Sequence, residues 1–160
     1  MDADENNKFQ RIGAVSNTHV GSDFEAVARA HLLATGLAVE PRFSVLIGVG
    51  ANKKNRLFDL GSSSPKIIVE CKSHRWTIGG NMPSAKMTVW NEAMFYFSLA
   101  PHDYRKILFV LRDFNVRKQE TLAHYYLRIH GHLIPEGVEI WEYDDSTKHV
   151  SILKSGEDAR

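Results

Sequence analysis

The sequence predicts an α/β fold in which a mixed central β-sheet is flanked by helices. Three segments carry apolar residues at helical spacing, strand-like runs precede and follow them, and turn residues separate the runs. A chain of 160 residues with 43% hydrophobic content can bury one core, and no linker rich in proline or glycine divides it. We therefore expect a single domain.

The first expected helix runs from Ser22 to Gly36, because Phe24, Val27, Ala28, His31 and Leu32 recur at three- and four-residue spacing. The elements expected after it are a strand at 37–49, a loop at 50–55, a hairpin with strands at 56–60 and 66–73, a helix at 84–99, a buried strand at 107–111, a helix at 117–130, and strands at 138–143 and 149–153. Mixed parallel and antiparallel pairing follows from this order.

The expected domain covers residues 19–154. Residues 1–18 and 155–160 are polar and without periodicity, so we expect flexible tails there. One cysteine allows no disulfide within the chain, and no apolar run approaches the length of a membrane span. The polar start MDADENNKFQ is unlike a signal peptide. The expectation is a cytoplasmic protein without a membrane partner.

Charge is nearly balanced over the whole chain, with 20 Lys and Arg against 19 Asp and Glu. A broad basic field of the kind common in nucleic-acid-binding proteins is therefore absent from the composition. Binding to nucleic acid would have to come from local clusters of cations.

Three ionisable residues stand in the expected central hairpin where a strand should be apolar. Asp59 lies in LFDLG, and Glu70 and Lys72 lie in IIVECKS. Side chains alternate along a strand, so Glu70 and Lys72 share one face while Cys71 points to the other. The hairpin brings Asp59 beside Glu70, and two carboxylates at that separation repel unless a cation lies between them.

Such a carboxylate pair suits Mg²⁺, which takes one or two carboxylates, keeps several waters and binds phosphate oxygens. A bound metal ion can lower the pKa of a water and stabilise charge on a reacting phosphate. Lys72 is placed to orient or deprotonate that water, or to pair with the phosphate.

The order of a helix glutamate, Glu25, then Asp59, then Glu70-x-Lys72 resembles the PD-(D/E)XK nuclease superfamily, which includes restriction endonucleases and Holliday-junction resolvases. The resemblance covers roughly residues 22–111 and departs from the motif at Phe58, where the family name expects proline. It implies a restriction-endonuclease-like αβββαβ core with Asp59 and Glu70 as metal ligands and Lys72 as the catalytic lysine. It also implies a metal contact from the backbone carbonyl of Cys71 and, through water, from Glu25.

The function that this resemblance implies is Mg²⁺-dependent hydrolysis of DNA phosphodiester bonds by an endonuclease of restriction or defence type. Mn²⁺ is expected to substitute for Mg²⁺. Two alternatives stay open: a structure-selective repair or Holliday-junction-resolving nuclease, and an inactive nucleic-acid-binding module with the same fold. Cutting both strands of a duplex calls for two active sites, so a homodimer is expected.

The site residues also have two structural interpretations. Glu70, Lys72 and Asp59 could form an exposed ion pair on a strand face, worth only about 0.2–1 kcal/mol. Glu25 could close a capping box with Ser22, in which its carboxylate returns to the Ser22 backbone.

Two clusters flank the expected site in sequence and could bind DNA phosphates and unpaired bases. The candidate nucleic-acid-binding residues are Lys53, Lys54, Arg56, His74, Arg75, Trp76 and Lys86. Solvated loop charges are the alternative. A zinc site at His124, His130 and His132 is a weaker alternative, since no carboxylate stands at a recognisable spacing. Cys71 is expected to be a small buried apolar residue.

Overall fold

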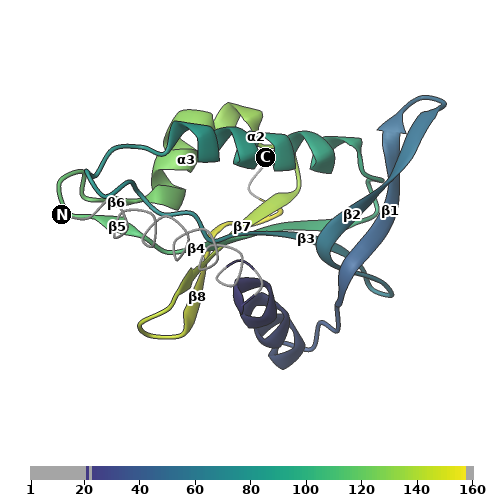
Figure 1. The fold of residues 1–160 in the computed structure, drawn as a ribbon. Coiled ribbons are helices and arrows are strands. Elements are labelled where there is room, and N and C mark those ends of the chain that lie inside the picture. Colours follow the sequence, from purple (N-terminus) through teal and green to yellow (C-terminus); the bar gives the residue numbers. More distant parts are fainter. Residues whose placement is uncertain (1–20, 22, 158–160) are drawn as a thin grey trace, which may run out of the picture.

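A six-stranded sheet runs through the part of the chain that the computed structural model describes, which is residue 21 and residues 23–157. Helices cover both faces of this sheet, so the α/β prediction with a mixed, helix-flanked sheet is confirmed (Figure 1). The expected tail at 1–18, Ser22 and the last three residues lie outside the described residues. No helix in the described ranges is long and apolar enough to cross a membrane.

The strands and helices follow the expected order. The strands of the sheet are β1 (Glu40–Val49), β2 (Asn52–Ser63), β3 (Lys66–Lys72), β4 (Arg105–Leu111), β7 (Val138–Asp144) and β8 (His149–Lys154). The helices are residues 23–34, α2 (Ser84–Leu99), α3 (Leu122–His130) and a 3₁₀ turn at Gly131–Leu133. Two short strands, β5 (Phe114–Asn115) and β6 (Glu120–Thr121), form a separate hairpin.

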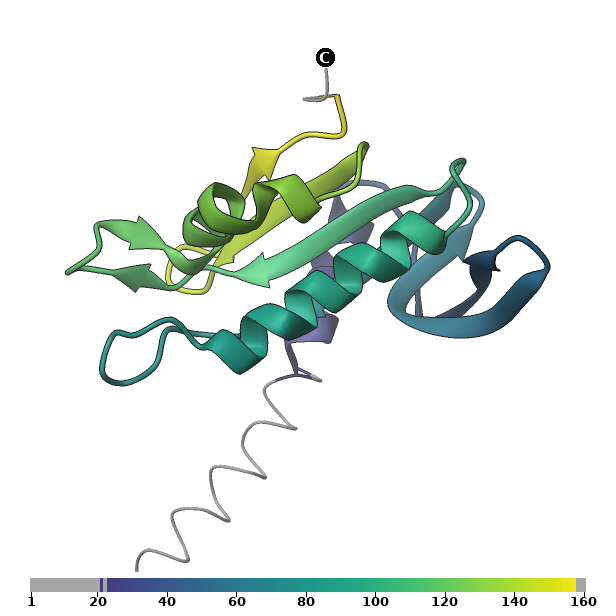
Figure 2. The same cartoon turned by 90° about the horizontal axis from the view of Figure 1, so that it is seen from above.

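The sheet has the strand order β1-β2-β3-β4-β7-β8. The central strands β3, β4 and β7 are parallel, and each outer pairing is antiparallel. Parallel neighbours need a crossover, and α2 and α3 lie in the two crossovers from β3 to β4 and from β4 to β7 (Figure 2). These two helices cover one face of the central strands, and the helix 23–34 covers the other.

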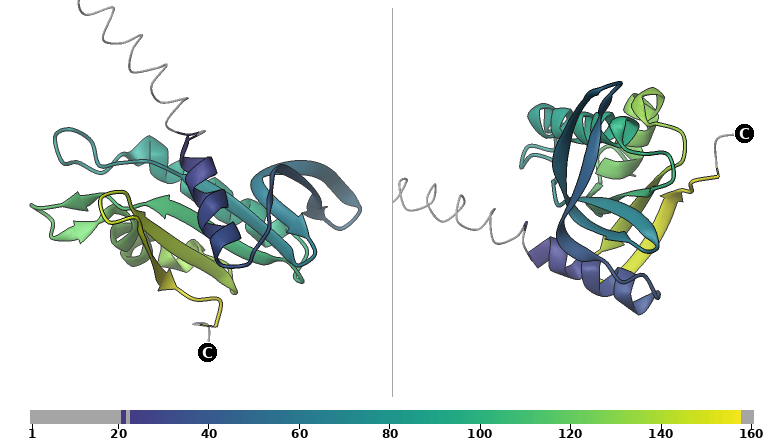
Figure 3. Two further views of the ribbon diagram at one scale, coloured as in Figure 1. Left: turned by 90° about the horizontal axis from the view of Figure 1, so that it is seen from below. Right: turned by 90° about the vertical axis from the view of Figure 1, so that its right-hand side faces the viewer.

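Two apolar clusters hold the layers together, one on each face of the sheet. The cluster under α2 and α3 is built around Trp90, Phe97 and Tyr126, all fully buried. The opposite cluster joins Phe24 and Leu32 of the helix 23–34 to the sheet (Figure 3). Strand β4 feeds alternate residues into both clusters, which explains the continuous apolar run in its sequence.

The boundaries of two elements differ from the prediction. The loop expected at 50–55 is a two-residue turn, and Lys54 already pairs with Ile47 inside the strand ladder. The polar residues at the start of β2 belong to a strand and not to a loop, because this end of the β1–β2 hairpin is exposed to solvent. The helix expected from Arg117 begins at Leu122, since residues 114–121 form the β5–β6 hairpin.

Gly48 is required by the geometry of the β1–β2 hairpin. Its φ is 145°, and a Cβ there would lie 2.1 Å from the backbone oxygen of Asn52. We expect Gly48→Ala to lower the free energy of unfolding, measured by urea denaturation, by about 2 kcal/mol or more. Gly131 is the matched control, because its backbone is helical and no atom lies within 4 Å of a Cβ. Gly131→Ala should be neutral or stabilising by up to about 1 kcal/mol.

Candidate active site

The β2 and β3 strands diverge at the position of Asp59. Their ladder runs from Ser63–Lys66 to Leu60–Val69, and the next pair in register would be Asp59 and Glu70. That pair is not part of the ladder between the described strands. Instead, the backbone N–H of Cys71 donates to the Asp59 carboxylate over 2.7 Å. The Asp59 side chain thus bridges the two strands at the point where they separate.

Strand β2 also turns over at Asp59. Phe58 belongs to the cluster under α2, whereas Leu60 belongs to the cluster against the helix 23–34. Residues two apart in a regular strand face the same side, so the strand rolls between them. Arg42, opposite this point on β1, has a φ of 53° and is skipped in the ladder. The roll places Asp59 where both faces of the sheet can be reached.

A cavity of about 630 Å³ opens at this fork. Four different elements contribute charged side chains to its border: the helix 23–34 contributes Glu25, β2 contributes Asp59, β3 contributes Lys72 and α2 contributes Lys86. The rest of the lining is Gly21, Cys71, Ser73, His74, Arg75, Thr77, Pro83 and Val89. Of the three residues expected to converge, Asp59 and Lys72 border this cavity and Glu70 does not, while Glu25 borders it as well.

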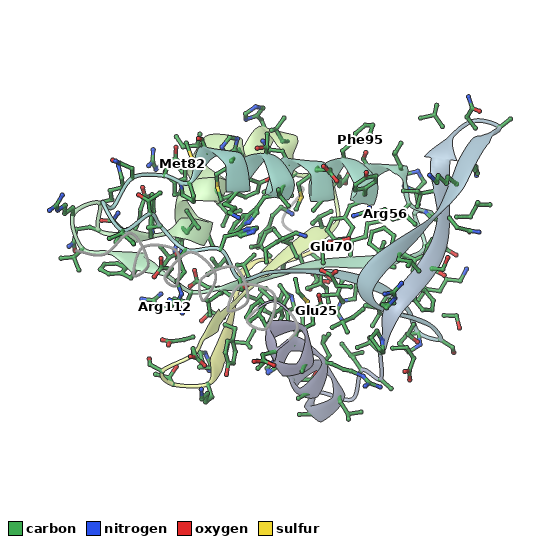
Figure 4. All side chains as sticks on the ribbon, viewed as in Figure 1. Glu25, Arg56, Glu70, Met82, Phe95 and Arg112 are labelled. Atoms are coloured by element: carbon green, nitrogen blue, oxygen red, sulfur yellow. The ribbon has the colours of Figure 1, made fainter. Side chains whose placement is uncertain are left out.

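Glu70 lies behind this cavity, at 2% exposure, and is not among the residues that line it. Its two oxygens accept from Lys72 Nζ at 3.0 Å and from an Arg56 guanidinium nitrogen at 3.2 Å. Figure 4 shows Glu70 and Arg56 between the sheet and α2, and Glu25 below the sheet. The ion pair between Glu70 and Lys72 that the structural alternative predicts is present, but it is buried and not exposed.

Arg56 is held as firmly as its partner. The guanidinium carbon lies 3.4 Å from the centre of the Tyr96 ring, and Nε is buried without a hydrogen bond among the described residues. A cation stacked on an aromatic ring and paired with a buried carboxylate is committed to the fold. Arg56 therefore does not project toward DNA as the sequence suggested.

Burial and mutual repulsion raise the pKa values of two carboxyl groups at the site. Burial raises the pKa of Glu70, Lys72 opposes this shift, and Asp59 adds to it. Burial also raises the pKa of Glu25, and the nearby charge of Asp59 raises it further. The Cys71 thiol packs beside the cluster against the helix 23–34, as expected for a small apolar residue, and burial raises its pKa well above its usual range. The carboxylates of Glu25, Asp59 and Glu70 therefore repel one another, and the charge of Lys72 partly offsets this repulsion.

His74 is a neutral hydrogen-bonding group and not one of the cations expected from the sequence. The indole N–H of Trp90 donates to His74 Nδ1 over 2.8 Å, and an indole nitrogen can only donate. Nδ1 is therefore an acceptor, so the ring proton resides on Nε2. Burial, together with the charges of Lys86 and Lys72, lowers the pKa of His74 to about 4.

Trp76 and Arg75 are tied to Asp113 beyond the end of β4. Trp76 is 9% exposed and donates its backbone and indole N–H groups to Asp113, while Arg75 forms an ion pair with the same carboxylate. The expected exposed stacking surface at Trp76 is wrong, because this ring packs in the core against Tyr125. Arg75 stays exposed and borders the cavity.

The remaining candidate cations divide into two groups. Lys86 borders the cavity from α2, as the sequence suggested. Lys53 and Lys54 lie at the far end of the β1–β2 hairpin, which projects away from the sheet in Figure 1. Six residues of extended strand separate Lys53 from Asp59, a path of up to roughly 20 Å. Lys53 and Lys54 are therefore remote from the cavity, and Arg56 is the member of this expected cluster that comes close to the site.

Over residues 21 and 23–157, no group of three or more His, Cys, Asp or Glu side chains is gathered as a metal site. The zinc alternative gains no support, since His124 is bonded to Thr121 and His130 stacks on Tyr126. Ser22 lies outside the described residues, so the capping box with Glu25 stays a prediction.

Comparison of the chain with protein-family models, curated proteins and solved structures gives no significant match.

Three structural contributors to the site escaped the sequence analysis. These are the Arg56–Tyr96 stack, the Trp90–His74 hydrogen bond and the anchoring role of Asp113. Each joins residues at least 16 positions apart and depends on tertiary packing. The only local signal was Asp113 itself, a charged residue directly after a buried strand.

We expect Glu25→Gln to raise the Tm at neutral pH. A carboxyl with a raised pKa in the fold stabilises it only while protonated, so that stability is lost as pH rises through the folded pKa. Glutamine stays neutral, and the gain should vanish below the ordinary glutamate pKa of about 4.3. Thermal unfolding at several pH values measures this, with exposed Glu92→Gln as the control. Equal Tm values for wild type and Glu25→Gln at pH 7 would contradict the repulsive cluster.

A second expectation concerns the ring of His74. In ¹⁵N NMR spectra, its Nε2 should carry the proton above pH 5, and the ring should titrate only near pH 4. Lys86→Gln should raise this pKa, because it removes one of the charges that lower it. A His74 that titrates near 6.5 in the wild type would show that the ring is solvated.

Proposed function

We propose that the protein is a metal-dependent endodeoxyribonuclease of the PD-(D/E)XK type. One observation carries the proposal: Asp59 and Lys72, from diverging strands, border the same cavity as Glu25, and Lys72 also contacts buried Glu70. A role in restriction or defence, and a homodimer that cuts both strands, remain predictions that follow from the resemblance.

The oxygen donors at the fork are of the kind that Mg²⁺ binds. Asp59 and Glu70 would be the protein ligands, with the Cys71 carbonyl and, through water, Glu25 as further contacts. Glu70 lies behind the cavity with Lys72 and Arg56 on its oxygens, so it would have to exchange Lys72 for the ion. All of these donors are hard oxygens, and two carboxylates are sufficient for an ion that keeps several waters. The raised pKa of Glu25, caused by burial and by Asp59, is the repulsion expected around such a site. When bound, Mg²⁺ supplies a water of lowered pKa and neutralises charge on the phosphate.

Lys72 is the residue to which we assign phosphate or water orientation. Its ammonium lies 3.0 Å from Glu70, and its side chain reaches the cavity at 15% exposure. An ammonium held by one carboxylate oxygen keeps two further N–H donors for a phosphate oxygen or an attacking water. Arg56 occupies the other oxygen of Glu70, so Glu70 keeps a cationic partner when Lys72 moves to the substrate.

His74 and Lys86 complete the polar wall around a bound phosphate. Lys86 brings a positive charge from α2, whereas His74 brings a directional N–H donor that stays uncharged at neutral pH. A neutral donor can hold an oxygen without trapping a negatively charged product as strongly as a cation would.

The test is cleavage of supercoiled plasmid DNA in the presence of Mg²⁺. We expect Lys72→Ala and Asp59→Asn to lower the cleavage rate at least about 100-fold, the scale of losing a general base or a charge-stabilising group. The matched controls are Lys66→Ala and Asp103→Asn, which break an exposed ion pair at the other end of β3. Both controls should cut at the wild-type rate.

Two outcomes would contradict the proposal. Equal cleavage by the wild type, Lys72→Ala and Asp59→Asn would show that a contaminant or another site cuts the DNA. Absence of cleavage by the wild type with either Mg²⁺ or Mn²⁺, on plasmid, flap and four-way-junction DNA, would favour a binding module without activity.

A further inference from the structure

A second hollow of about 480 Å³ adjoins the cavity. Its walls are the loop before α2 and the segment from the end of β4 through β5. Arg75 and Thr77 line both hollows, so the two lie side by side at these residues. The loop and the β5–β6 hairpin lie at the same end of the molecule in Figures 1 and 2.

The walls of this hollow are fixed to each other. Asn115, 7% exposed, donates from its amide to the backbone oxygen of Gly80 at 2.9 Å. Its side-chain oxygen accepts from the backbone N–H groups of Arg117 and Lys118. Asp113 anchors the other end by accepting from Trp76. The groove is therefore shaped before any ligand binds, which lowers the entropy cost of binding.

Apolar side chains stand exposed on both walls. Ile78 is fully exposed on the loop, and Phe114 and Val116 are 44% and 73% exposed on the hairpin. Scattered apolar residues on a surface need no explanation, but these three line one concave surface. The guanidinium of Arg112 lies 5.7 Å from the Phe114 ring, which leaves part of that ring open to solvent.

Cations accompany these apolar groups. Arg75 and Arg117 line the groove, and Lys118 lies 5.9 Å from the Trp76 ring. Within the described part of the chain, neither Arg117 nor Lys118 has a carboxylate at ion-pairing distance, and Asp113 is already paired with Arg75. Positive charge beside exposed aromatic and aliphatic surface is the combination that holds an unpaired nucleic-acid strand.

We propose that this groove binds an unpaired segment of a nucleic-acid strand and leads it to the cavity at Asp59 and Lys72. The choice of nucleic acid as the ligand rests on the proposed function. Bases in a duplex are stacked and expose only their edges, so Ile78, Phe114 and Val116 could contact base faces only where the strand is unpaired. The substrate class that follows is DNA with a flap, a gap or a branch near the scissile bond.

Binding can be measured without cleavage, by fluorescence anisotropy of labelled oligothymidylate in EDTA. We expect the wild type to bind the single strand more tightly than a duplex of equal length. Phe114→Ala should weaken single-strand binding about tenfold, which corresponds to about 1.4 kcal/mol. Phe114→Tyr keeps an aromatic face and should bind like the wild type. Phe95→Ala is the matched control, since Phe95 is exposed on the outer side of α2 (Figure 4).

Arg117→Ala should weaken single-strand binding and reduce its salt dependence by about one phosphate contact. Equal affinity of Phe114→Ala and Phe95→Ala for the single strand would overturn the proposal, as would equal binding of duplex and single strand. A change in self-association of Phe114→Ala, measured by sedimentation with unchanged DNA binding, would assign the surface to contacts between copies and also overturn it. Circular dichroism spectra check that each variant is folded.

The outcomes separate this inference from the proposed function. If no assay shows Mg²⁺-dependent cleavage but single-strand binding depends on Phe114, the groove proposal is supported and the nuclease proposal is contradicted. If cleavage depends on Lys72 but single-strand binding does not depend on Phe114, the nuclease proposal is supported and the groove proposal is contradicted.

Discussion

The hydrogen bond from the Cys71 backbone to the Asp59 carboxylate is the interaction on which the rest of the site depends. A strand that leaves a ladder exposes unpaired N–H and C=O groups, which are costly to bury. Here the Asp59 side chain takes the place of a backbone acceptor. Strand β2 can therefore separate from β3 while the backbone N–H of Cys71 keeps a hydrogen-bond partner. The separation of the strands creates the cavity, and the same bond holds a carboxylate at its mouth.

A buried ionic network supports this opening from behind. Glu70 has cationic partners on both oxygens, and Arg56 is stacked on Tyr96 of α2. Desolvating three charges in one place is unfavourable unless each is matched, so the network tolerates little displacement. It connects β2, β3 and α2 beyond the point where the β2–β3 ladder ends. The residues that would bind a ligand therefore sit on a rigid base.

The sequence was sufficient for the order of the main elements and for the proximity of Glu70 to Lys72, and tertiary packing decided the rest. Periodicity predicted α2 with its bounds, and the apolar run at β4 predicted a strand buried on both faces. Alternation placed Glu70 and Lys72 on one face, but it could not show that Glu70 is enclosed, since enclosure depends on Arg56 and Tyr96. Composition suggested that Trp76 and Arg56 were exposed binding groups. Their partners, Asp113 and Glu70, are 37 and 14 residues away.

The hydrogen bond between Trp90 and His74 connects the deepest part of the hydrophobic core to the ligand-accessible wall. Trp90 is fully buried against Tyr126 of α3, so its indole orientation is set by how α2 and α3 pack. Any replacement that repacks these helices rotates the indole and with it the placement of a proton at the cavity. The stability of the core and the orientation of the His74 ring are thus coupled at Trp90 and Tyr126, and these interior positions should tolerate fewer replacements than their burial alone implies.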